Sequence, residues 1–168
     1  MTAYKWTNFP PTHGCLRDSK QEGTCSRLGS KGESRVIKGM GMIDEYFDVH
    51  EKHCESFPDA SSSGKLVTIF EVGSFYELYQ SIEPERGPDL ARVCQIMSIL
   101  RTRRDKKAAS PDIPADIKNP YLAGFTAHSL GKYLPMLLAE GYTVVQVSQV
   151  TPPPAPKREV VAVHSPSM

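Results

Sequence analysis

The sequence predicts an α/β (α+β) domain: a small mixed β-sheet with flanking helices. Segments of strand composition alternate along the chain with segments whose apolar residues recur at helical spacing. The apolar fraction of 39% and the charged fraction of 23% are those of a globular protein. The length of 168 residues suits one domain with a tail. We expect four or five strands, covered by two or three helices.

The first part of the chain differs in composition from the rest. Residues 1–39 are rich in Gly, Ser, Thr, Lys and Arg, and hold seven Lys or Arg against three Asp or Glu. This composition predicts a disordered basic tail, so the folded domain comprises residues 40–168. Order begins with an amphipathic helix in "MIDEYFDVHEKHCE", which has a strongly acidic outer face. Its apolar stripe consists of Ile43, Tyr46, Phe47 and His50.

A hairpin is predicted next. Residues 57–64 have loop composition, and "KLVTIFEV" (65–72) is β-rich and largely apolar, as a buried strand is. Gly73 and Ser74 separate it from "FYELY" (75–79). A two-residue Gly-X link between strand formers predicts a type II′ turn. Because side chains alternate along a strand, Phe75 and Glu77 point one way, and Tyr76 and Leu78 the other.

The middle of the chain predicts a helix and a strand between two loops. After the loop "IEPERGP" (82–88), a helix is expected over 88–96 with Pro88 in its first turn. Its apolar stripe consists of Leu90, Val93, Cys94 and Met97. "IMSILRTR" (96–103) is the next strand candidate, and residues 103–120 form a long polar loop.

The last third has the clearest pattern. "YLAGF" (121–125) predicts a short strand, and 127–141 a helix with Ser129 as N-cap and Gly141 as C-cap. Pro135 lies inside this helix and is expected to kink or shorten it. "YTVVQVSQV" (142–150) alternates as a strand, "TPPPAPK" reads as a stiff linker, and "EVVAVHS" as a last short strand.

Several functional classes find no support in the sequence. There is no apolar run near 18 residues and no signal pattern, and the four cysteines lack framework spacing. An intracellular protein is expected, with nucleus, organelle and viral factory left open. His50, His53 and Cys54 have the spacing of a helical metal pair, but no second pair follows, so a coincidental helix surface is favoured. We expect no metal, no cofactor and no catalytic site.

One block of charge stands out. "RTRRDKK" places five basic residues around Asp105 although the formal net charge of the chain is only +1. Such a block is usually a solvated loop and less often a phosphate-contacting patch. Its candidate phosphate contacts are Arg101, Arg103, Arg104, Lys106 and Lys107.

Three segments together carry a resemblance to a known family. "FEVGSFYELY" (70–79) resembles the aliphatic-Gly-x-Phe-Tyr-Glu-Leu-aromatic segment in the N-terminal mismatch-recognition domain of the MutS family. "AGFTAHSLGKYLPMLLAEGYTVVQVSQ" (123–149) and "KREVVAVHSPS" (157–167) resemble two later stretches of that domain, in the same order. The helix near residue 42 followed by "VGSFYELY" is closest to the viral and organellar branch.

The resemblance implies a binding module rather than an enzyme. Phe75 matches a Phe that stacks on a mispaired base, and Glu77 a Glu that hydrogen-bonds this base. The implied partners are double-stranded DNA with mismatches or small unpaired loops, together with other MutS-family chains or repair proteins. The alternative is a truncated relative that serves as a protein-interaction module without DNA binding. Without the resemblance, Phe75 would be read as a core residue.

The sequence also departs from the family. Ser74 stands where Asp is more common, and the loops at 82–88 and after Lys107 are longer than usual. No G-x-x-x-x-G-K-[ST] segment is present, and the chain stops where a connector domain would begin. We therefore expect no ATPase activity and no clamp that encircles DNA, which predicts weak binding.

Overall fold

The computed structural model describes residues 41–166; the predicted disordered tail, residues 1–39, lies outside this range. The described part contains helices and strands in mixed order. The helices are α1 (Met42–Ser56), α2 (Pro58–Ser62), α3 (Leu90–Met97), η1 (Ala127–Ser129, a 3₁₀ turn) and α4 (Leu130–Ala139). The strands are β1 (Leu66–Val72), β2 (Phe75–Gln80), β3 (Thr102–Arg103), β4 (Tyr121–Thr126), β5 (Thr143–Gln149) and β6 (Arg158–His164).

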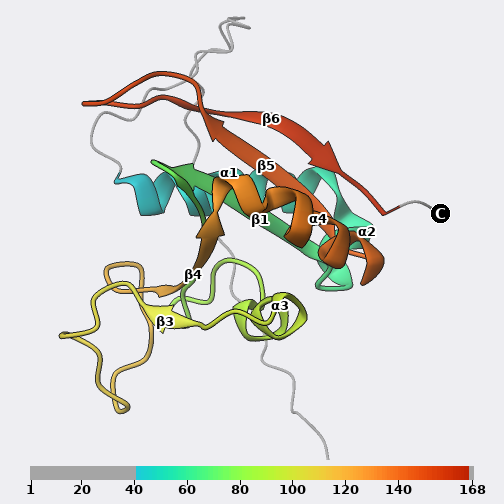
Figure 1. Cartoon of the computed structure of the whole chain (residues 1–168). Coiled ribbons are helices and arrows are strands. Elements are labelled where there is room, and N and C mark those ends of the chain that lie inside the picture. Colours follow the sequence, from blue (N-terminus) through green and yellow to red (C-terminus); the bar gives the residue numbers. More distant parts are fainter. Residues whose placement is uncertain (1–40, 167–168) are drawn as a thin grey trace, which may run out of the picture. The chain divides into compact units, whose positions relative to one another are not determined.

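The six strands form one mixed sheet in the order β3-β4-β2-β1-β5-β6 (Figure 1). The β1–β5 pair is parallel and joins Leu66 to Thr143, whereas the other pairs are antiparallel. The predicted α/β class with a small mixed sheet is confirmed. A β-bulge between Gln146 and Val147 interrupts the pairing of β5 with the outer strand β6.

Helices cover both faces of the sheet, and each face has its own core (Figure 1). On one face, α1 buries Tyr46 and Phe47 against Phe70 of β1. On the other, α3 and α4 pack on Val67 and Leu78. Successive β1 residues therefore serve opposite cores, which is why "LVTIF" is buried throughout and is apolar except for Thr68.

The first two predicted helices form, with small corrections. Helix α1 buries the predicted stripe, and α3 buries Leu90, Val93, Cys94 and Met97. Pro88 lies before α3, since Asp89 is its N-cap and accepts a hydrogen bond from the Arg92 amide (3.2 Å). Residues 57–64 are not wholly loop, because the short helix α2 begins at Pro58, where the fixed φ of proline suits a first helical turn.

The strand predicted over 96–103 is largely wrong. The helical stripe of α3 continues to Met97, which is 1% exposed, and Ser98 ends the helix in the left-handed conformation (φ 54°). Only Thr102 and Arg103 pair with β4. A short apolar run does not by itself distinguish a buried strand from the end of a helix.

The last third follows the prediction more closely. Helix α4 spans Leu130–Ala139 with Pro135 inside it, so it is shorter than the predicted 127–141: residues 127–129 form η1, and Glu140 rather than Gly141 is the C-cap. Ser129 occupies its N-cap without a capping bond; its hydroxyl instead lies 2.8 Å from that of Thr126. The segment "TPPPAPK" is not a linker, because it closes an antiparallel pair in which the Val150 amide donates to the Lys157 carbonyl (2.9 Å). Within residues 41–166, no helix has both the length and the apolar character that a membrane crossing needs.

Candidate nucleic-acid interface

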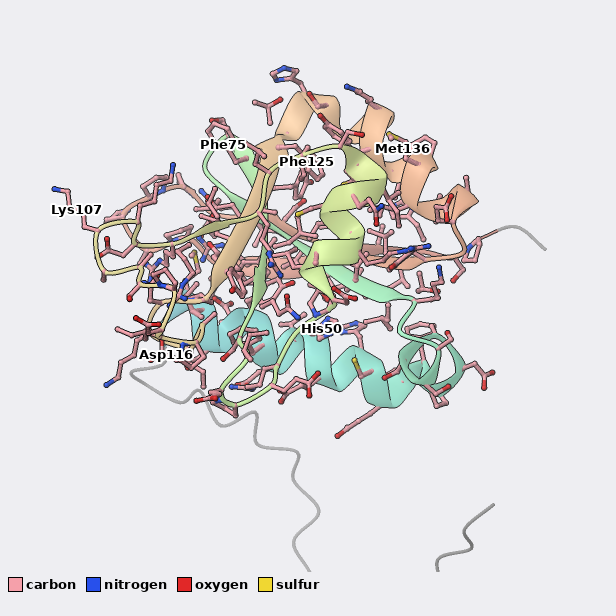
Figure 2. All side chains as sticks on the ribbon, turned by 90° about the horizontal axis from the view of Figure 1, so that it is seen from below. His50, Phe75, Lys107, Asp116, Phe125 and Met136 are labelled. Carbon is pink, nitrogen blue, oxygen red and sulfur yellow. The ribbon has the colours of Figure 1, made fainter. Side chains whose placement is uncertain are left out.

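The hairpin between β1 and β2 exposes Phe75 at the end of an interior strand of the sheet. Gly73 adopts φ +62°, which the first central residue of a II′ turn requires. Val72 pairs with Phe75, so only Gly73 and Ser74 form the turn, and Phe75 is the first residue of β2. The Phe75 side chain is 46% exposed, and it projects from the hairpin end in Figure 2.

Glu77 lies two residues further along β2, on the same face as Phe75. Its Oε2 atom accepts a hydrogen bond from the hydroxyl group of Tyr79, the next residue on that face. Burial is the main reason why the pKa of the Tyr79 hydroxyl is raised, and the bond to Glu77 raises it further. Glu77 therefore combines a partly exposed carboxylate with a buried hydrogen-bond donor that stays protonated.

The opposite face of β2 fixes the hairpin to the sheet. Tyr76 is 4% exposed and its ring lies 5.9 Å from that of Phe125 on β4. The Tyr76 hydroxyl accepts a hydrogen bond from the side-chain amide of Gln146 (2.8 Å) and lies 3.0 Å from the Ser148 hydroxyl. The expected alternation is thus present: Tyr76 and Leu78 are core residues, and Phe75 is directed to solvent.

Another segment reaches the same end of these strands as Phe75. Thr126 pairs with Phe75, and the Ser74 carbonyl accepts the Ala127 amide (2.8 Å), so the η1 turn lies against the hairpin. The exposed His128 is part of this turn, and its Nε2 atom is 3.3 Å from the Thr126 hydroxyl. The sequence alone does not single out His128; the β2–β4 register places it two residues beyond Thr126, the partner of Phe75.

The basic residues predicted from "RTRRDKK" are not equivalent. Arg103 is committed to the fold, because its guanidinium donates to the carbonyls of Asn119 (3.0 Å), Ile113 (3.0 Å) and Pro114 (3.3 Å). Arg101 lies over the ring of Tyr121, 4.1 Å from its centroid. Arg101 is nevertheless exposed, and so are Arg104, Lys106 and Lys107, the last of which points outward in Figure 2.

These basic residues do not adjoin Phe75. Along β4, Thr126 pairs with Phe75, whereas Tyr121 pairs with both Gln80 and Arg103. At about 3.3 Å per residue, the five steps from Phe75 to Gln80 separate the two ends of β2 by roughly 17 Å. The wedge candidate and the basic segment therefore occupy opposite ends of the same two strands.

The two histidines of the candidate metal pair have partners within the fold, and so does Arg158 on β6. His50 is buried with Nδ1 3.0 Å from the Thr68 hydroxyl, and His53 Nδ1 lies 2.7 Å from the Val49 carbonyl. Among residues 41–166, no group of three or more His, Cys, Asp or Glu side chains could hold a metal ion. Arg158 donates to the Glu71 carbonyl (2.9 Å) and lies 3.7 Å from the Glu45 carboxylate, so it too is engaged.

Comparison with known families agrees with this geometry. A family model described as MutS domain I matches residues 41–168. The chain belongs to this family. The resemblance inferred from three short segments is confirmed, and the match includes the Phe75 hairpin, η1, α4 and the β5–β6 pair. Its place in the viral or organellar branch remains a prediction.

Full-length relatives are much longer than this chain. It is 30% identical over 119 residues to the DNA mismatch repair protein MutS of Parabacteroides distasonis, which covers 71% of this chain and 11% of that protein. It is also 30% identical over 128 residues to the DNA mismatch repair protein HexA of Streptococcus pneumoniae, covering 74% of this chain and 12% of that protein. The chain thus spans a small part of these relatives.

Proposed function

We propose that this MutS domain I chain binds double-stranded DNA at a mispaired or unpaired base and acts in DNA mismatch repair. The observation that carries the proposal is Phe75: an aromatic side chain, 46% exposed, at the hairpin end of β2 with a carboxylate on the same face. The family and the names of the relatives support the same reading.

Phe75 acts as a wedge in this proposal. An apolar side chain inserted from the minor groove partly unstacks a base step and kinks the duplex. A mispaired or unpaired base costs least to disturb, so the wedge enters preferentially at a defect. Stacking on an aromatic ring contributes on the order of 1–3 kcal/mol and tolerates any base.

Glu77 acts as the selector. The phosphates of an ordinary duplex repel a carboxylate, whereas at a defect the Glu77 carboxylate forms a hydrogen bond with the exposed edge of the stacked base. A residue that would repel a normal duplex thereby becomes favourable at a defect. The side chains of Phe75 and Glu77 alternate with the buried Tyr76 and Leu78, so the two functional groups are held on one face.

The basic residues at the other end of β2 supply phosphate contacts without sequence information. Arg101, Arg104, Lys106 and Lys107 are exposed and suit this role, whereas Arg103 holds the loop. Four of the five basic residues expected from the sequence therefore remain candidate phosphate contacts, without Arg103. Since the net charge is only +1, binding by the chain alone is expected in the range of nonspecific complexes, roughly 10⁻⁴–10⁻⁶ M.

Fluorescence anisotropy at low salt tests the proposal. The 168-residue chain is titrated into a duplex with one unpaired thymine, a duplex with one G·T pair, and the matched duplex. Wild type is compared with Phe75→Ala and with Leu100→Ala, a control in which an 84% exposed apolar side chain distant in sequence from the hairpin is shortened. We expect a preference for the defect that disappears in Phe75→Ala and persists in Leu100→Ala.

Equal affinity of the wild-type chain for all three duplexes would refute this function. If Phe75→Ala still prefers the defect, the chain binds DNA defects but Phe75 is not the wedge. Circular dichroism of both variants shows whether the fold is intact, and little change is expected because neither side chain is in the core.

The outer strand β6 favours a second candidate, a protein-interaction module. Within residues 41–166 it pairs with β5 alone, and it exposes Val160, Val161 and Val163 by 40%, 50% and 37%. Unpaired strand edges with apolar side chains are templates for pairing with another chain. If Val161→Lys abolishes association with another chain while duplex binding is unchanged, β6 serves this role; sedimentation of the wild-type chain with and without DNA provides the measurement.

A further inference from the structure

We propose that Tyr79 is a positioning residue for recognition: its hydroxyl group holds the Glu77 carboxylate through Oε2, so that Oε1 remains for the base stacked on Phe75. This inference rests on the proposed function and extends it to a residue that touches no DNA. It arises from one contact, the hydrogen bond from the Tyr79 hydroxyl to Glu77 Oε2.

The donor of this bond, the Tyr79 hydroxyl, is held more rigidly than the acceptor, the Glu77 carboxylate. Tyr79 is 1% exposed, and its ring packs edge-on against that of Tyr46 on α1, with 5.1 Å between the centroids. Tyr46 is itself fully buried and donates from its hydroxyl to the Thr68 carbonyl (3.1 Å). Helix α1 and strand β1 therefore fix the position of the Tyr79 hydroxyl. This hydroxyl in turn orients the Glu77 carboxylate.

One oxygen of the Glu77 carboxylate, the acceptor of this bond, has no hydrogen-bond partner within residues 41–166. A carboxylate offers two oxygens and about four lone-pair positions. Among residues 41–166, Oε2 of Glu77 accepts the Tyr79 hydroxyl, and no hydrogen bond reaches Oε1. One oxygen is thus used for orientation, and the other is available to a ligand.

The strand beside Glu77 leaves room for this arrangement. Gly124 on β4 pairs directly with Glu77. A Cβ atom at position 124 would lie 2.9 Å from the Tyr76 carbonyl oxygen and 3.5 Å from Cγ of Glu77. The absent side chain keeps the flank of Glu77 open, so its orientation depends on the bond to Tyr79 rather than on packing against β4.

A double-mutant cycle separates positioning from a general structural role. Tyr79→Phe keeps the packed ring and removes the hydroxyl; Glu77→Ala removes its partner; the double variant completes the cycle. Tyr142→Phe is the matched control, because Tyr142 is also buried (2% exposed) but belongs to the core on the opposite face of the sheet. The readout is the ratio of matched to defect dissociation constants for each variant.

We expect Tyr79→Phe to lower this ratio roughly three- to tenfold, the effect of one hydrogen bond, while affinity for the matched duplex is unchanged. In the Glu77→Ala background, Tyr79→Phe should have no further effect on the ratio. Without DNA, NMR should show a slowly exchanging Tyr79 hydroxyl proton in the wild-type chain and in Tyr142→Phe, and its loss in Glu77→Ala.

The outcomes distinguish this inference from the proposed function. If wild type does not prefer the defect, the proposed function fails and the positioning role fails with it. If wild type prefers the defect and Phe75→Ala abolishes that preference, but Tyr79→Phe behaves like Tyr142→Phe, only the role of Tyr79 is wrong. Additive effects of Tyr79→Phe and Glu77→Ala, or a hydroxyl proton unaffected by Glu77→Ala, also overturn it.

Discussion

His50 illustrates how a buried polar residue in α1 links the fold to pH. Its ring is 4% exposed, stacks parallel to that of Tyr46 with 6.3 Å between centroids, and lies 3.0 Å from the Thr68 hydroxyl through Nδ1. Burial disfavours the charged ring and lowers the pKa of His50 to about 4, although Glu51 opposes part of this shift. The folded chain therefore keeps His50 neutral in mildly acidic solution.

This predicts a loss of stability in acid. Between pH 6.5 and about 4 the unfolded chain binds a proton at His50 that the folded chain does not, so the free energy of unfolding falls as pH falls, by up to about 3 kcal/mol. Above pH 6.5 His50 is neutral in both the folded and the unfolded chain, so it no longer lowers the free energy of unfolding. Urea unfolding at several pH values should show a flatter profile for His50→Gln, whereas His128→Gln, at an exposed position, should retain the wild-type slope.

The loop between β2 and α3 is held in place by ion pairs to α1 and by a close backbone approach at Gly87. Arg86 pairs with Ser81 across this loop, and its guanidinium contacts Glu51 (2.5 Å) and Asp48 (3.0 Å) on α1. These contacts raise the pKa of Arg86 and lower that of Glu51. Gly87 follows with φ +90°, and a Cβ there would lie 2.6 Å from the Tyr79 carbonyl oxygen.

Gly87→Ala should therefore destabilise the chain more than an ordinary glycine substitution. Gly64→Ala is the matched control, since Gly64 also has positive φ (+65°) but no atom within 4 Å of an added Cβ. Both variants carry the backbone cost of a left-handed alanine, about 1–2 kcal/mol. The close contact should add about 1–3 kcal/mol in Gly87→Ala alone, measured by urea unfolding. Equal losses in the two variants would show that the loop moves aside.

Some helices and strands could be predicted from the sequence, and others could not. Helix α1 and the β1–β2 hairpin are predictable because Tyr46, Phe47 and the Gly73 turn follow strong local rules. The segment 96–103 is not, since Ile96 and Met97 fit a strand and a helix equally well until α3 packs on the sheet. For the site, Phe75 and Glu77 follow from strand alternation and family resemblance. The Tyr79 bond and the β2–β4 register that pairs Thr126 with Phe75 depend on tertiary geometry.

Charge is distributed unevenly over the described part of the molecule. Residues 40–60 hold six acids against Lys52, whereas "RTRRDKK" holds five basic residues. If the latter segment contacts phosphate, each contact releases counterions, and affinity falls as salt rises. The basic segment and Phe75 then contribute to binding in separable ways, one through charge and the other through stacking.

The salt dependence of duplex binding tests this separation. Replacing Lys106 and Lys107 by Gln should weaken binding equally for matched and defect duplexes. It should also reduce the slope of log affinity against log salt by about 0.9 for each lost phosphate contact. Lys52→Gln, an exposed change on the acidic helix α1, should leave the slope unchanged. Anisotropy titrations at several salt concentrations measure these slopes, and an unchanged slope in the double variant would exclude Lys106 and Lys107 from the interface.

The parallel pair of β1 with β5 has a consequence for biosynthesis. Leu66 pairs with Thr143, a separation of 77 residues (143 minus 66). At a translation rate of about 5–20 residues per second, β1 waits roughly 4–15 s before its neighbour has been made. During that time, the apolar residues of "LVTIF" have no partner on one edge. The nascent chain therefore passes through an interval in which one edge of β1 is unpaired and open to association with other chains.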